Sequence, residues 1–126
     1  MSQVLKIRPS EPVQVNQERL GALYTQLGEA NAEDVVCRAM EELALRLAQC
    51  DKLYRESKLV DLRKNARSLI AIADQIGMNS LGRVARDVTQ CVDDKDEVAL
   101  AATLSRLIRI GERSLTAIWD HQDLSL

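Results

Sequence analysis

Apolar residues recur along the chain at alternating intervals of three and four, which is the spacing of one face of an α-helix. The clearest run lies between residues 57 and 77, where the apolar positions are Leu59, Leu62, Ala66, Leu69, Ala73 and Ile76. Its opposite face carries Arg63, Lys64 and Arg67. The pattern predicts a core-facing helix that ends at Gly77, because glycine commonly follows the last residue of a helix.

The same spacing predicts five helices in all, over residues 17–27, 32–54, 57–77, 80–91 and 97–120. Asn16 and Asn31 directly precede two of them and are candidate N-caps. Short polar connections place consecutive helices side by side in opposite directions. The expected fold class is therefore all-α: an antiparallel up-down-up-down four-helix bundle, with the short first helix covering one end.

Gly111 lies in the apolar seam of the last predicted helix. A glycine at this position either lets a neighbouring helix approach closely or is simply tolerated there, and the sequence pattern favours neither.

The first 15 residues differ from the rest of the chain. Pro9 and Pro12 oppose helix formation, and the alternation of Val13 and Val15 favours an extended segment. We therefore expect two parts: an extended N-terminal arm over residues 1–15 and one helical domain over residues 16–126. A total of 126 residues is an ordinary length for a single domain.

Composition narrows the classes of function. A net charge of −2, with one Trp, two Tyr and no Phe, provides neither electrostatic attraction nor stacking surfaces for nucleic acid. No apolar run approaches the roughly 20 residues that span a bilayer. The N-terminus also has no apolar core of the signal-peptide type. We therefore expect a cytoplasmic protein that binds neither nucleic acid nor membrane.

Candidate catalytic and metal-binding groups are few. Cys37, Cys50 and Cys91 lie in predicted helices and are interpreted as small buried apolar residues, with a redox role as the alternative. A single histidine and the lack of a Cys-x-x-C pair argue against a metal site. There is also no Ser-His-Asp set and no phosphate-binding glycine loop. We expect no enzymatic activity and no cofactor, and we interpret His121 as an exposed residue near the end of the last helix.

The order of the helices and one short motif resemble the histidine phosphotransfer (HPt) family over residues 20–119. The central helix of that family carries a pattern like Ala-His-x-Leu-Lys-Gly-Ser. Six residues after its glycine come another glycine and an apolar residue. The matching stretch here is Ala66-Arg67-Ser68-Leu69-Ile70-Ala71-Ile72, followed by Gly77-Met78. The positions that match the pattern are Ala66, Leu69, Gly77 and Met78.

The departures from the family pattern fall on the residues that carry its chemistry. Arg67 replaces the histidine, Ile70 the lysine and Ala71 the glycine. Phosphotransfer needs a neutral ring nitrogen that attacks phosphorus, which an imidazole with a pKa near ~6.5 supplies. A guanidinium group stays protonated and has no free lone pair. The resemblance therefore implies the fold of an HPt domain without phosphate transfer.

The resemblance also implies a protein-binding face, because HPt domains present this part of the central helix to receiver domains, whose phosphorylation pocket is acidic. The expected contact residues are Arg63, Lys64, Arg67, Ile70, Ala71 and Asp74. Residues 58–91 hold six basic and three acidic side chains, so this segment is basic in an acidic chain. We therefore expect an adaptor that binds a response-regulator receiver domain or a histidine kinase.

A second interpretation is a helical bundle that mediates self-association or another contact unrelated to phosphorelay. Ile70, Ile72 and Leu45 supply apolar side chains for a possible homodimer. A dimer that buries the helix over residues 57–77 is unable to bind a receiver domain through it. The oligomeric state in solution therefore distinguishes the two interpretations.

Overall fold

The structure is a computed structural model that describes residues 15–124, with side chains described as far as Ile118. Its five helices are α1 (Gln17–Leu27), α2 (Glu29–Arg55), α3 (Leu59–Ile76), α4 (Asn79–Asp93) and α5 (Glu97–Leu124). The predicted all-helical class is confirmed for this part of the chain. The arm predicted over residues 1–15 lies outside it except for Val15, which forms an isolated antiparallel bridge with Met78. The interpretation of the His121 side chain also lies outside it.

The beginning of α1 agrees with the sequence prediction, and the beginning of α2 does not. Asn16 caps α1, where its Oδ1 accepts a hydrogen bond from the backbone N–H of Arg19 at 3.0 Å. Asn31 is no N-cap, because α2 begins directly after Gly28 and therefore already includes Asn31. The physical reason is the backbone of Gly28, whose φ of 79° turns the chain between two helices without an intervening loop.

Three helices end in the same type of turn, in which one residue adopts the left-handed conformation. Ser57, Gly77 and Lys95 hold this position after α2, α3 and α4, with φ values of 58°, 78° and 56°. In the turn after α3, the N–H of Met78 donates to the carbonyl oxygen of Ala73 at 2.8 Å. This is the Schellman arrangement, and it satisfies carbonyl groups that the helix end leaves free. The turns are short enough to bring consecutive helices into contact.

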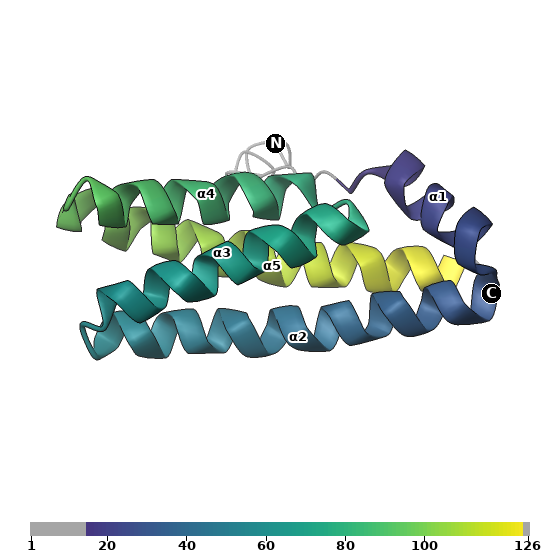
Figure 1. The fold of residues 1–126 in the computed structure, drawn as a ribbon, viewed down its shortest axis with the longest axis horizontal. Helices are drawn as coiled ribbons and strands as arrows, with labels where there is room; N and C mark the ends of the chain where they lie inside the picture. Colours follow the sequence, from purple (N-terminus) through teal and green to yellow (C-terminus); the bar gives the residue numbers. More distant parts are fainter. Residues whose placement is uncertain (1–14, 125–126) are drawn as a thin grey trace, which may run out of the picture.

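The four longer helices contact one another in the cyclic order α2, α3, α4, α5, and α5 returns to α2. Figure 1 shows that α2 and α5 run along the long axis and that α1 lies at one end, where it contacts α2 and α3. The core enclosed by these helices is almost entirely aliphatic. Its largest fully buried side chains include Leu43, Leu62, Leu69, Ile76, Leu107 and Ile110. The predicted apolar stripe of residues 57–77 thus faces this core.

Gly111 lies where α5 packs directly against Leu47 of α2. A Cβ atom added to Gly111 would lie 2.8 Å from Cδ2 and 3.2 Å from Cγ of Leu47. Both residues are buried, and an added methyl group would have to displace the side chain of Leu47. Of the two interpretations of Gly111, the structure therefore supports close helix approach.

The predicted burial of the cysteines is confirmed for Cys50 and is wrong for Cys37, which is exposed. Cys91 is half-buried. Cys37 directly follows the buried Val36, and consecutive helical residues point about 100° apart. Its side chain therefore leaves the core stripe and reaches the seam between α2 and α5.

Candidate functional site

The six residues predicted to bind a partner all lie on α3, and the structure divides them into three groups. Lys64, Arg67 and Ala71 are exposed, Ile70 is half-buried against the core, and Arg63 and Asp74 form ion pairs with residues of α4. Arg63 and Asp74 therefore serve to join α3 to α4 within the domain.

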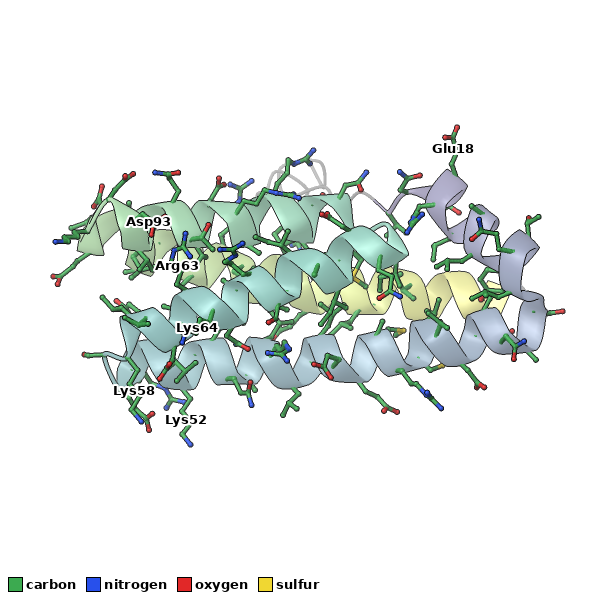
Figure 2. The ribbon with its side chains drawn as sticks, in the orientation of Figure 1. Glu18, Lys52, Lys58, Arg63, Lys64 and Asp93 are labelled. Carbon is green, nitrogen blue, oxygen red and sulfur yellow. The ribbon has the colours of Figure 1, made fainter. Side chains whose placement is uncertain are left out.

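Arg63 and Asp93 form the first ion pair between α3 and α4. Nε and Nη2 of Arg63 donate to Oδ1 and Oδ2 of Asp93 at 2.7 and 3.1 Å. Figure 2 shows Arg63 pointing from α3 toward Asp93 at the end of α4. Such two-bonded pairs are the strongest form of arginine–carboxylate contact. The hydrogen bonds from Arg63 lower the pKa of Asp93, and the nearby charge of Arg67 lowers it further.

Asp74 and Arg86 form the second ion pair, toward the other end of α3. Nη2 of Arg86 donates to Oδ2 of Asp74 at 2.7 Å. Gly82 lies beside this pair, and a Cβ atom added there would be 3.1 Å from Oδ1 of Asp74. The arginine belongs to α3 in the first pair and to α4 in the second. The two pairs therefore hold the helices in register and leave no net charge between them.

Arg67 lies between these two ion pairs, on the exposed side of α3. It follows Arg63 by four residues and precedes Asp74 by seven, so all three lie near one line along the helix. Within the described residues, Arg67 and Lys64 form no ion pair. Since Arg63 and Asp74 are paired with residues of α4, Lys64 and Arg67 supply the positive charge that α3 presents to solvent, and the exposed Asp61 lies one turn before Lys64.

An apolar border lies beside these cations. Val60 is 70% exposed, and Ala71 is exposed one turn after Arg67. We call Val60, Lys64, Arg67 and Ala71 the α3 face. It combines two flexible cations with a small apolar area, which is a composition suited to transient contact with an acidic protein surface.

One buried polar cluster, between α2 and α3, was not predicted from the sequence. Asn65 is 5% exposed. Its Nδ2 donates to the carbonyl oxygen of Arg46 at 2.7 Å and to Sγ of Cys50 at 3.1 Å, and its Oδ1 accepts from Nη1 of Arg46 at 2.9 Å. These bonds fix α3 against α2. The burial of Asn65 could have been predicted from its spacing, because it follows Leu62 by three residues and precedes Leu69 by four, as residues of the apolar stripe do.

Burial, rather than the hydrogen bonds of this cluster, makes Cys50 an unreactive thiol. Burial raises the pKa of Cys50 to about 11, although the hydrogen bond from Asn65 and the charge of Arg46 both act in the opposite direction. The thiol is therefore protonated at neutral pH, and a protonated thiol is a poor nucleophile. The role of this cluster is structural.

No group of three or more potential metal ligands occurs among the described residues. Within the same part of the chain, no helix is long and apolar enough to cross a membrane. Comparisons of the chain with models of known protein families, with curated proteins and with solved structures gave no match. The geometry of the α3 face is therefore the basis for the function proposed below.

The Arg63–Asp93 pair predicts a pH dependence. Because the pKa of Asp93 is lowered in the folded protein, the pair stabilises the fold above the ordinary carboxyl pKa of about 3.9, and this contribution is lost as the pH falls through the lowered value. Arg63→Gln is expected to return the pKa of Asp93 toward its ordinary value in an NMR titration. Arg86→Gln, which breaks the other pair, serves as the control. An ordinary pKa for Asp93 in the unsubstituted protein would contradict the pairing.

Proposed function

We propose that the protein is a non-catalytic, HPt-like signalling adaptor of the cytoplasm, which binds a receiver domain or a histidine kinase through α3 and α4. The fold we propose for it is an antiparallel up-down-up-down bundle of α2 to α5, with α1 covering one end. The cyclic order of helix contacts and the short turns support this arrangement.

The observation that carries the proposal is an exposed Arg67 near the middle of α3, whose 18 residues span 59–76. In the HPt-like register this is the position of the phospho-accepting histidine. The phosphorylation pocket of a receiver domain is rich in acidic side chains. A guanidinium group directed at that pocket complements it as a permanent cation, and its planar fork suits carboxylates.

Two further residues of the α3 region support binding without phosphate transfer. Ile70 stands where the family pattern has a lysine, and it is half-buried against the core, so it contributes packing and no charge. Arg67 itself has no nitrogen lone pair with which to attack phosphorus. An adaptor of this kind occupies a receiver domain or responds to its state, and it passes no phosphate onward.

Direct binding to purified receiver domains tests the proposal. We expect Arg67→Glu to weaken binding at least tenfold in isothermal titration calorimetry, because it places a carboxylate against an acidic pocket. Arg38→Glu is the matched control, since Arg38 is an exposed arginine of α2 and receives the same change in charge. Equal affinities of the Arg67→Glu and unsubstituted proteins, or no binding to any receiver domain, would contradict the proposal.

Self-association through an apolar face is the second candidate. The observation that favours it is the exposure of Leu45 and Val60, which are 57% and 70% exposed. Ile70 and Ile72 favour it less, because both are half-buried against the core of the same chain. Sedimentation equilibrium separates the candidates: a dimer that Val60→Asp dissociates places α3 in a homodimer contact and leaves no room there for a receiver domain.

A further inference from the structure

A groove lies between α2 and α5, the pair of helices opposite α3 and α4 in the cyclic order of contacts. It consists of two adjoining cavities of about 330 and 440 Å³, which share Ala44 and Leu115 as lining residues. The groove follows α2 from Cys37 to Asp51. That distance corresponds to about 21 Å, or about four helical turns, at 1.5 Å per residue.

The floor of the groove is apolar. Ala44 and Ala48 line it from α2, and Ile108 and Leu115 line it from α5. The two alanines are exposed and the two larger side chains are half-buried, so apolar surface faces solvent along the whole seam. The alanines are one helical turn apart, and Ile108 and Leu115 are two turns apart. The apolar side chains of the floor therefore recur at the same interval as those on one face of a helix.

The rim of the groove is acidic on both sides. Glu41 stands on α2 and Glu112 on α5, and both are exposed. Asp51 lines one end, where it forms an i,i+4 ion pair with Arg55 at 3.1 Å. All the charged residues that line the two cavities are therefore acids.

We propose that this groove binds an amphipathic helix of a partner protein, with large apolar residues on one face and lysine or arginine on its flanks. The length of the groove fits about four turns of helix. The apolar floor accepts the apolar face, and Glu41 and Glu112 pair with the cations on either flank. The proposal does not depend on the function proposed for the α3 face.

The charge of the rim argues against a second copy of the chain as the occupant. In a two-fold symmetric dimer, the same patch of each subunit faces the other. Glu41 and Glu112 would then meet acidic rims of the same kind, and like charges brought together across an interface oppose association. A basic partner meets no such repulsion. The residues that line the groove belong to α2 and α5 and those of the α3 face to α3, so the two sites share no residue and both can be occupied in the same molecule.

The test uses a synthetic, fluorescently labelled peptide of about 16 residues, long enough to span about 24 Å as a helix, with leucines on one face and lysines beside them. Its control carries glutamates in place of the lysines. Fluorescence anisotropy with the full chain is expected to give at least tenfold tighter binding for the lysine peptide. Backbone NMR shifts on adding this peptide are expected on α2 and α5.

A substitution in the groove tests the location of binding. Ala44→Arg is expected to weaken binding of the lysine peptide at least tenfold, because it fills the groove and adds a positive charge. Gln49→Arg, which places the same side chain on an exposed position of α2 outside the groove, is expected to leave binding unchanged. Circular dichroism establishes that both variants keep the helical fold.

Three results would overturn the proposal. The first is equal binding of the two peptides, or no binding of either. The second is a set of NMR shifts confined to α3 and α4, which would place the peptide on the other seam. The third is a homodimer of the unsubstituted protein that Ala44→Arg dissociates, which would assign the groove to a second copy of the chain.

Discussion

Replacing Gly77 with alanine is expected to lower the free energy of unfolding by about 3 kcal/mol, the sum of about 1–2 kcal/mol for a left-handed L-residue and about 1–3 kcal/mol for overpacking. Gly77 has a φ of 78° and is buried. A Cβ atom there would lie 3.0 Å from both the carbonyl oxygen and Cβ of Asn16. Asn16 is the N-cap of α1, and its N–H donates to the carbonyl oxygen of Gly77 at 2.7 Å. The substitution therefore pushes α1 away from the turn between α3 and α4.

The reverse substitution, to glycine, in an equivalent turn measures only the cost of the left-handed backbone conformation. Lys95 is exposed and adopts a φ of 56° in the same type of turn. Lys95→Gly is expected to raise the free energy of unfolding by about 0.5–1 kcal/mol, because relief of strain exceeds the entropic cost of glycine. Urea unfolding followed by circular dichroism measures both variants. If Gly77→Ala costs no more than Lys95→Gly gains, the contact with Asn16 contributes nothing.

Gly77→Asn separates the two contributions in the same position. Asparagine adopts the left-handed conformation more readily than alanine, so the backbone strain is smaller, whereas the added Cβ remains. Most of the loss attributed to contact with Asn16 is therefore expected to persist in this variant. Hydrogen exchange is expected to be faster in α1 for both Gly77 variants, since α1 loses its contact with the turn.

The second large effect is expected at Gly111. Gly111→Ala is expected to lower the free energy of unfolding by about 2 kcal/mol, because overpacking of about 3 kcal/mol exceeds the gain of about 1 kcal/mol in helix propensity. The added methyl group would overlap the side chain of Leu47, which is 5% exposed, and either this side chain or the two helices would have to shift. The expected loss of stability therefore arises from the contact between α2 and α5.

Gly21→Ala is the matched control for Gly111→Ala. Gly21 lies within α1, and a Cβ atom added there has no neighbour within 4 Å. Only the higher helix propensity of alanine over glycine acts at this position. The free energy of unfolding of this variant is therefore expected to be higher by about 0.5–1 kcal/mol. In a Leu47→Ala background, Gly111→Ala is expected to become neutral or stabilising, because the clashing methyl groups are gone. A destabilisation that is unchanged in that background would exclude Leu47 as its cause.

Most of the secondary structure could be predicted from the sequence. The run over residues 57–77 predicted α3, which spans Leu59–Ile76, because a long apolar stripe with a terminal glycine has few other solutions. Prediction failed for Asn31, where two helices meet at Gly28 without a loop. A cap is a weak local preference, and the contacts of α1 with α2 outweigh it.

The candidate site was predicted in part. The exposure of Arg67 follows from its place opposite the apolar stripe, which needs only the helix period. The partners of Arg63 and Asp74 were not predicted. Asp93 and Arg86 follow them by 30 and 12 residues along the chain, and the side chains meet only because α4 folds back on α3. Whether an exposed cation is free or paired is decided by the neighbouring helix.

The sequence by itself determined the helices, their inward faces and the absence of an imidazole at position 67, since these depend on residue identity and on spacing along one helix. The tertiary structure alone decided that the side chain of Leu47 packs against Gly111, that Asn65 is buried and that a groove lies between α2 and α5. These features depend on the distance between helices far apart in sequence. That distance is set by how side chains from all of them fill one core.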